Sequence, residues 1–250
     1  MSEPVVYEMA GQIAIITLNR PEKRNVVNTA MRDGVLAAWQ RFEADPAARV
    51  AILTAAGDKA FCAGRDLSEA ASGHGHGFIP ILRDEVSVSK PVIAAVNGAA
   101  LGGGCFLAIS CDLCVAAEHA SFALTEARVG RAPIYAFWLN DVIPQKVALE
   151  MSMTGNPIGA RRAYELGLVN HVVSAAGLME KAMALASDLC AAAPLSVAAT
   201  KAMLYETAGL DTVSALELAL KRFKPVFESE DAMEGMRAFR EKRPPQWKGR

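Results

Sequence analysis

The chain has 250 residues, of which 52% are hydrophobic and 21% are charged, and its formal net charge is -1. A chain of this size and composition can bury a sizeable core. The near-neutral charge gives no basic footprint for nucleic acid, and no cluster of Lys and Arg lies beside an apolar helix as a membrane-surface anchor requires. We therefore exclude nucleic acid and membrane as partners and expect small molecules and further copies of the chain.

The N-terminus and the cysteines indicate the compartment. Residues 1–4 show no basic segment followed by an apolar core, and no run reaches the roughly 20 apolar residues of a membrane span. We therefore expect a cytoplasmic protein. An odd number of cysteines suits a reducing compartment; the five are Cys62, Cys105, Cys111, Cys114 and Cys190. Cys111 and Cys114 have the spacing of a redox or zinc pair, but no second Cys or His pair accompanies them, so we expect buried free thiols.

The first part of the chain alternates predicted strands and helices. β-Branched residues indicate strands at residues 13–18 and 50–54. Between them, Asn28 can cap a helix whose apolar positions recur at helical spacing, namely Met31, Val35, Trp39 and Phe42. This alternation is typical of an α/β layer protein.

The next segment carries turns and a polar loop. Residues 55–67 are expected to form a turn, a short strand and a glycine-preceded helix start. Residues 68–77 are small, polar and glycine-rich, and the spacing of His74 and His76 could bind a metal. Because nothing nearby completes a ligand set, we expect a surface loop and no metal site. Residues 79–88 are predicted to form a helix that leads into the central strand.

The glycine run at residues 102–104 is the most informative stretch. It follows a predicted buried strand at 91–96 and opens a predicted short helix at 103–111. Glycine lets a ligand approach the main chain closely, and the first N–H groups of a helix can stabilise an oxygen on which negative charge develops. The run could therefore form half of an oxyanion hole. The alternative is a glycine turn that only allows the helix to pack tightly on the strand.

The second half of the chain becomes increasingly helical. We expect a strand at 115–116, an extended passage at 121–126 and an aromatic-rich segment at 131–138. Six helices are predicted after it, at residues 145–154, 160–166, 178–192, 196–208, 211–227 and 230–242. Ser229 is a good N-cap for the last of them. We expect a core over residues 1–194 and a C-terminal helical region over 195–250.

Several motifs, in order along the chain, resemble the crotonase (enoyl-CoA hydratase/isomerase) superfamily. They cover nearly the whole chain and comprise residues 19–25, 61–67, 90–104, 122–130, 163–170 and 229–243. Each motif alone is unspecific, but their order and spacing together are highly specific. Within the superfamily, residues 121–126 and the ending at 247–250 are most similar to carnitinyl-CoA dehydratase-like members.

The resemblance implies a fold and a ligand. The fold is an α/β spiral of ββα units with a C-terminal helical region used in trimerisation, in a homotrimer or a hexamer built as a dimer of trimers. The ligand is a coenzyme A thioester, which belongs to the substrate, so that no separate cofactor and no metal are expected. The resemblance also implies a role in fatty acid metabolism.

The resemblance assigns individual residues as well. The backbone N–H groups of Arg65 and Gly103 would form the oxyanion hole. Arg24, Ala63 and Asp66 would lie along the pantetheine and adenine. In hydratases of the family the final helices of a neighbouring subunit add contacts, which fall here on Phe223, Phe239 and Lys242. The alternative to a coenzyme A contact is that the two phenylalanines are buried aromatic side chains and that Lys242 is a solvated lysine at the negative end of its helix.

One catalytic position departs from the family pattern. Hydratases of this family hold a water between two glutamates, of which Glu126 matches the second, whereas Phe106 stands at the place of the first. A phenyl ring neither accepts a proton nor orients water. Tyr135 or Asp141 could supply the lost polar group, and Cys105 is a poor nucleophile in an apolar helix.

Four hypotheses remain open. The chain could be a hydratase-type lyase whose only acid/base is Glu126, or a Δ3-Δ2 enoyl-CoA isomerase, for which a single glutamate at this place suffices in the family. It could also be a non-catalytic acyl-CoA-binding homologue, because Phe106 has replaced the first glutamate. The fourth, a nucleotide-binding module, lacks the Rossmann and P-loop patterns.

Overall fold

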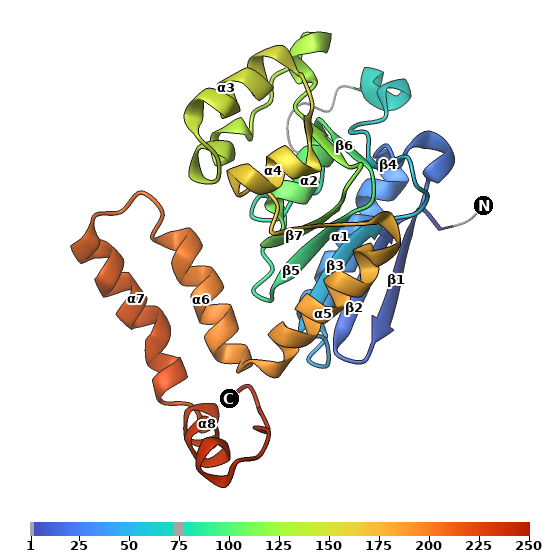
Figure 1. Cartoon of the computed structure of the whole chain (residues 1–250). Helices are drawn as coiled ribbons and strands as arrows, with labels where there is room; N and C mark the ends of the chain where they lie inside the picture. The colour runs from blue at the N-terminus through green and yellow to red at the C-terminus, as the bar shows by residue number, and fades with distance from the viewer. Residues whose placement is uncertain (1–2, 73–77) are drawn as a thin grey trace.

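We analysed a computed structural model of the chain, which describes residues 3–72 and 78–250 (Figure 1). The expectations for His74 and His76, and for the first two residues, fall outside this range. Among the described residues, no single helix is long and apolar enough to cross a membrane, whereas the bent pair Ala175–Ala191 and Pro194–Glu206 passes the same test together.

A six-stranded sheet forms the centre of the molecule. Its strands lie in the order β1-β2-β3-β5-β7-β10, with bounds Val5–Ala10, Ile13–Leu18, Val50–Ala55, Val92–Val96, Leu113–Ala117 and His171–Val173. Only β1 and β2 pair antiparallel, and the later neighbours are parallel. Every residue of β3 and β5 is buried, as expected for parallel strands that are covered on both faces.

Helices cover the two faces of this sheet. On one face α5 (Leu178–Ala191) packs its Ala182 and Ala186 against Ile52 and other side chains that alternate along the strands. On the opposite face α1 (Thr29–Ala44) buries Trp39, together with the rest of its predicted apolar positions. The predicted cap is confirmed, because Asn28 Oδ1 accepts a hydrogen bond from the Met31 N–H at 3.0 Å.

A second, four-stranded sheet carries the repeating architecture. Its order is β4-β6-β8-β9, with bounds Ala60–Cys62, Ala99–Leu101, Ser121–Ala123 and Ile158–Gly159. Three times, a strand of the large sheet is followed by a strand of the small sheet and then a helix: η2 (Leu67–Ser72), α2 (Gly103–Ser110) or η3 (Glu126–Val129). The spiral of ββα units implied by the resemblance is therefore confirmed, although the glycine-preceded start after Gly64 is a 3-10 helix.

The helix predicted at residues 79–88 is wrong. The chain there forms a turn in which Leu82 and Val86 make an isolated bridge and Arg83 has φ 70°. Pro80 lacks an N–H group, and the acidic side chain of Asp84 accepts a hydrogen bond from Tyr135, which belongs to a distant segment. Long-range contacts thus decide the conformation of this segment.

The elements in the last quarter of the chain are all helices, as predicted. The helices not yet named are η1 Pro21–Lys23, η4 Ala136–Asp141, α3 Gln145–Thr154, α4 Ala160–Leu166, η5 Ala175–Gly177, α6 Pro194–Glu206, α7 Thr212–Phe227 and α8 Glu230–Glu241. The predicted cap of α8 is confirmed, since Ser229 Oγ accepts a hydrogen bond from Ala232 N–H at 3.1 Å.

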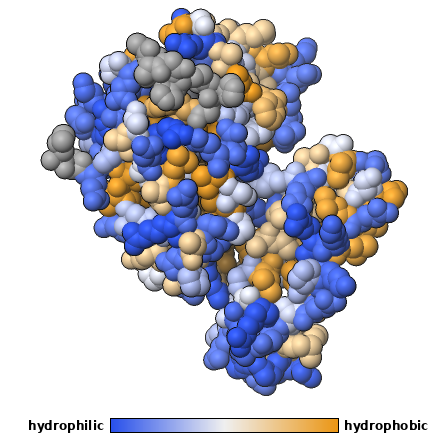
Figure 2. Space-filling model, turned by 180° about the vertical axis from the view of Figure 1, so that it is seen from behind, coloured by the Kyte–Doolittle hydropathy of each residue, from blue (hydrophilic) through white to orange (hydrophobic). Residues whose placement is uncertain are grey.

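The hairpin of α6 and α7 projects away from the sheets (Figure 1), and neither helix buries a residue within one chain. Large apolar side chains stay exposed on the C-terminal helices, among them Leu216, Leu220, Phe227, Met233, Met236 and Phe239. Hydrophobic surface is visible on this part of the molecule in Figure 2. Apolar surface of this extent marks an interaction site.

Candidate active site

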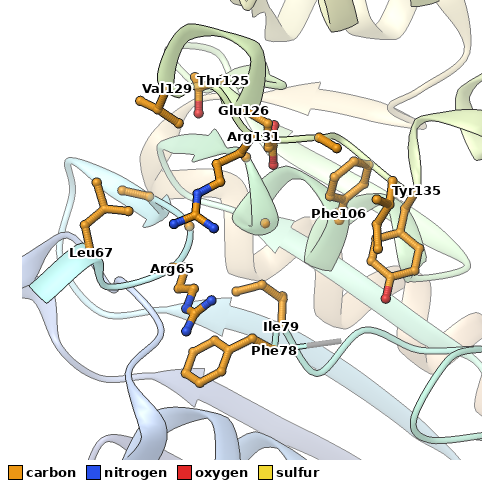
Figure 3. A pocket seen from close by; sticks show the side chains of 16 residues that line it. Arg65, Leu67, Phe78, Ile79, Phe106, Thr125, Glu126, Val129, Arg131 and Tyr135 are labelled. Atoms are coloured by element: carbon orange, nitrogen blue, oxygen red, sulfur yellow. The ribbon is translucent and has the colours of Figure 1, made fainter. Parts of the chain in front are cut away.

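A cavity of about 450 Å³ opens at the N-terminus of α2 (Figure 3). Its wall is built from the residues that follow β4, from the first turn of α2, from η3 and from the segment that follows η3. The predicted residues Ala63, Arg65, Gly103 and Glu126 all line it. Residues more than 60 positions apart in the sequence therefore meet here because the small sheet places β4, β6 and β8 side by side.

The N-cap of α2 and its first residue, Gly102 and Gly103, line this cavity. Gly102 is the N-cap with φ 53°, and its carbonyl accepts hydrogen bonds from Cys105 N–H at 2.9 Å and Phe106 N–H at 3.2 Å. The amide of Gly103 precedes these first helical donors and lies at the positive end of the helix dipole. The positive φ of Gly102 favours glycine, and a Cβ atom there would lie 3.0 Å from Glu126 Oε1, so the carboxylate lies close to the N-terminus of α2.

Arg65 lies opposite this helix on an extended segment. Val27 N–H donates to Gly64 O and Asp66 N–H donates to Val27 O, both at 2.8 Å. Because this parallel bridge uses the peptides on either side of Arg65, the N–H of Arg65 itself is directed away from Val27. A Cβ atom at Gly64 would lie 3.5 Å from the Gly103 nitrogen, so the two segments that bear the predicted amides are adjacent.

Glu126 is the first residue of η3 and carries the only carboxylate among the described residues that line the cavity. Its Oε2 atom is buried and has no hydrogen-bond partner within the described part of the chain. Burial raises the pKa of this carboxyl above its ordinary value, because the charged form is poorly solvated. A buried carboxylate without a partner is costly, and such groups are concentrated at functional sites.

An aromatic wall closes the cavity beside Glu126. Phe106 is only 4% exposed, and its ring meets the Tyr135 ring edge-on at a centroid distance of 5.5 Å. Tyr135 lines the cavity, but its hydroxyl donates to Asp84. Asp141 lies exposed at the end of η4 and does not line the cavity. Of the two candidate replacements for the missing glutamate, therefore, only Tyr135 reaches the site, and its hydroxyl is engaged elsewhere.

The remaining predicted ligand contacts lie outside this cavity. Asp66 pairs with Arg20 at 3.3 Å, and its hydrogen bonds with Ser68 and Arg20 lower the pKa of the Asp66 carboxyl. Arg24, which follows Arg20 by four positions in the sequence, is exposed and has φ 52°. The other three residues belong to α7 or to the end of α8: Phe223 is half-buried, whereas Phe239 and Lys242 are exposed. None of the five lines the cavity within one chain.

Several side chains that line the cavity were not predicted as site residues, among them Phe78, Ile79 and Arg131. Phe78 and Ile79 line the cavity. The Arg65 guanidinium stacks on the Phe78 ring, 4.3 Å from its centroid. Figure 3 shows Arg131 extending into the space between Glu126 and Arg65. The sequence carries no local signal for the first two, whereas Arg131 lies in the segment that already stood out for its aromatic residues.

The cysteines behave as buried thiols. Cys62, Cys105, Cys111 and Cys114 are buried and free, which confirms the expectation for the last two. Burial raises the pKa of the Cys62 and Cys114 thiols to about 12 and also raises the pKa of Cys105, so none is an activated nucleophile. Among residues 3–72 and 78–250, no group of three or more His, Cys, Asp or Glu is placed to hold a metal ion.

Comparison with known proteins agrees with this architecture. A family model described as enoyl-CoA hydratase/isomerase matches residues 8–250. A carnitinyl-CoA dehydratase of Escherichia coli K12 is 42% identical over 262 aligned positions that cover 100% of both chains. The crystal structure of an enoyl-CoA hydratase from Mycobacterium tuberculosis H37Rv superposes with a TM-score of 0.92 at 39% identity over 100% of both chains.

A more distant structure shows the same fold. The enoyl-CoA hydratase of Bacillus anthracis superposes with a TM-score of 0.91 at 32% identity and covers 99% of this chain and 100% of its own. Matches that span the full length, in sequence as well as in structure, establish the relationship for the whole chain and not for one motif. The chain is thus an enzyme of the enoyl-CoA hydratase/isomerase family, the crotonase superfamily, and is carnitinyl-CoA dehydratase-like.

Proposed function

We propose that this enzyme binds an acyl-CoA thioester, removes a proton from the carbon next to the thioester carbonyl and returns it with Glu126 as the single acid/base. The observation that carries this proposal is the buried, unpartnered Oε2 of Glu126 in the same cavity as the first turn of α2, within the residues described. No separate cofactor is required, because coenzyme A is part of the substrate.

The two main-chain amides supply the electrostatic part of the reaction. The thioester oxygen would accept hydrogen bonds from Arg65 N–H and Gly103 N–H, whose segments are adjacent. As the proton leaves, negative charge moves onto this oxygen, where the N-terminal end of α2 stabilises it. Both donors belong to the backbone, so the long side chain at Arg65 does not interfere with this role.

Glu126 supplies the proton transfer. Burial raises the pKa of its carboxyl, which brings the acid and base forms closer to equal population near neutral pH. A single carboxylate that shuttles one proton is sufficient for Δ3-Δ2 isomerisation of an enoyl-CoA. Water addition requires a second group to hold the water, and Phe106 occupies that side of the site. We therefore place isomerisation ahead of hydration for this chain.

A dehydratase is the second candidate, because the relatives named carnitinyl-CoA dehydratase match the full chain. Elimination of a 3-hydroxyl group uses the same α-proton abstraction but also needs a proton for the leaving oxygen. Glu126 is the only carboxyl group available for both tasks among the described lining residues.

Assembly into a homotrimer or hexamer in the cytoplasm is part of the proposal. The exposed apolar faces of the C-terminal helices support it, and a neighbouring copy would bring Phe223, Phe239 and Lys242 to the ligand. Mass measurement in solution by light scattering tests this point. A monomer that binds acyl-CoA with full affinity would contradict the assignment of these three residues.

Parallel assays separate the candidate reactions. The protein is incubated with a 3-enoyl-CoA, with crotonyl-CoA and with a 3-hydroxyacyl-CoA, and the double-bond shift, hydration and dehydration are followed separately. We expect the double-bond shift to be fastest. Hydration or dehydration without any double-bond shift would overturn the single-carboxylate proposal, and tight binding without turnover of any of the three thioesters would contradict the proposed function.

The rate should depend on pH through Glu126. The base form must be ionised to remove the proton, so kcat/KM is expected to fall as the pH drops through the pKa of this carboxyl. Because burial raises that pKa, the fall should begin clearly above the ordinary value of 4.5. A pH profile of kcat/KM for the 3-enoyl-CoA measures this directly. A flat profile down to the ordinary carboxyl range would show that Glu126 is not the titrating base.

A further inference from the structure

The turn at residues 82–86 holds the aromatic wall of the cavity in place. It lies where the sequence predicted a helix, and three of its side chains, those of Arg83, Asp84 and Glu85, contact different parts of the molecule. Asp84 accepts the hydrogen bond of the Tyr135 hydroxyl, and Glu85 pairs with Arg32 of α1. The backbone of Leu82 donates to Ser110 Oγ, at the end of α2, at 3.3 Å.

Arg83 makes the most extensive of these contacts. Its guanidinium lies over the Trp138 ring at 4.4 Å and over the Tyr205 ring at 4.2 Å, so that it is stacked between two aromatic side chains. The backbone of Arg83 has φ 70°, a conformation that a side-chain-bearing residue adopts only where its surroundings hold it. The turn is therefore fixed by its contacts rather than by local preference.

One end of this stack reaches the cavity. The Trp138 ring packs on the Tyr135 ring at 5.3 Å, and Tyr135 in turn packs on Phe106 at 5.5 Å. Phe106 and Tyr135 line the cavity beside Glu126 (Figure 3). Arg83, which does not line the cavity itself, is thus connected to Phe106 through the Trp138 and Tyr135 rings.

The other end is anchored on α6. The Tyr205 hydroxyl donates to Asp112 Oδ1 at 2.9 Å, and Lys201 pairs with Asp112 Oδ2 at 2.8 Å. Asp112 Oδ2 also accepts the Val92 N–H at 2.7 Å at the start of the central strand β5. Tyr205 is therefore held against the buried strand β5 through Asp112. Arg83 connects Tyr205 to Trp138, because its guanidinium contacts both rings.

We propose that Arg83 is a positioning residue that fixes the Phe106–Tyr135–Trp138 wall and thereby limits the length of the acyl group that the enzyme accepts. This inference rests on the proposed function and adds a substrate class to it: short acyl chains. The wall presents apolar ring surface to the acyl group and blocks extension beyond Phe106. Without the guanidinium, Trp138 loses its contact with α6 and the wall becomes free to move outward.

Binding measurements test the proposal without requiring turnover. The dissociation constants of butyryl-CoA and decanoyl-CoA are measured by calorimetry for the wild type, for Arg83→Met and for Arg83→Lys. Wild type should bind butyryl-CoA more tightly. Arg83→Met should shift the affinity ratio of the two ligands by about tenfold towards decanoyl-CoA. Arg83→Lys should restore only part of the wild-type ratio, because an ammonium group can lie over one ring but cannot stack between two.

The matched control is Arg41→Met. Arg41 also lies over an aromatic ring, that of Tyr7, at 4.1 Å, but neither residue lines the cavity. It should leave the affinity ratio unchanged even if it lowers the melting temperature. An unchanged ratio in Arg83→Met, with both ligands still bound, would overturn the positioning role. Failure of the wild type to bind either thioester would instead contradict the proposed function.

Discussion

Glu126→Gln is expected to reduce the turnover of a 3-enoyl-CoA by roughly 10²–10⁴-fold. The amide cannot take up the α-proton, and no other carboxyl group lines the cavity among the described residues. Binding of the thioester should persist, because the oxyanion-hole donors belong to the main chain. Steady-state kinetics with the purified variant, together with calorimetric binding of a saturated acyl-CoA, measure the two effects separately.

The same substitution should not harm the fold. Glu126 Oε2 has no partner in the described structure, and burial raises the pKa of the carboxyl. A carboxyl whose pKa is raised on folding stabilises the protein at low pH, and this contribution is lost as the pH rises through the folded-state pKa. In Glu126→Gln no charge forms at this buried position as the pH rises, so the variant does not lose this stability. Its melting temperature near neutral pH should therefore equal or exceed that of the wild type.

Glu150→Gln provides the matched control, since Glu150 is exposed on α3 and does not line the cavity. Its turnover and melting temperature should both stay near the wild-type values. If both variants turn over the substrate at the wild-type rate, Glu126 has no part in the mechanism and another group must be the base.

Gly104→Ala is expected to cost at least about 3 kcal/mol of folding free energy and to abolish activity in whatever protein still folds. A Cβ atom at this position would overlap the carbonyl oxygen of Cys62 and lie 2.7 Å from its carbonyl carbon. Both atoms belong to the backbone of β4, so no side-chain rotation can relieve the clash. Relief requires α2 to move away from β4.

That movement would also separate the two proposed oxyanion donors. Gly103 begins α2, and Arg65 follows β4 by three residues, so any added spacing between helix and strand falls between their amides. Urea denaturation measures the stability change and kcat measures the catalytic loss. Since the total stability of a domain is about 5–15 kcal/mol, the variant should remain measurable at low temperature.

Gly159→Ala is the control for this experiment. Gly159 has φ -77°, and a Cβ atom there would meet nothing within 4 Å. We expect a stability change below about 1 kcal/mol and unchanged kcat. A Gly104→Ala protein as stable and active as Gly159→Ala would show that the packing of α2 on β4 does not determine the site.

Local signals in the sequence predicted the elements that depend on local physics. The caps at Asn28 and Ser229, the apolar spacing in α1 and the glycine run before α2 are all confirmed. By contrast, β6 was missed because three residues beside a glycine turn carry no pattern of their own. The turn at residues 82–86 was mistaken for a helix because its conformation is set by Tyr135 and Trp138, which lie about 50 positions away in the chain.

The site residues likewise fall into those that the sequence predicted and those that it did not. The resemblance pointed to Glu126, Arg65, Gly103 and Ala63, and the structure brings these four to one cavity. Phe78 and Ile79 could not be anticipated, because two apolar residues without a motif carry no local signal for a cavity wall. The residues assigned to a neighbouring subunit also stay predictions, since within one chain they lie on α7 and at the end of α8.

Exchange of the α-protons of butyryl-CoA in D2O tests the central claim most directly. This saturated thioester can be neither isomerised nor hydrated, so exchange reports only proton removal by Glu126 with charge stabilisation at Arg65 and Gly103. We expect mass spectrometry to show deuterium uptake at the α carbon with the wild type and none above background with Glu126→Gln. Equal uptake with both proteins, or bound butyryl-CoA without any uptake by the wild type, would contradict the account.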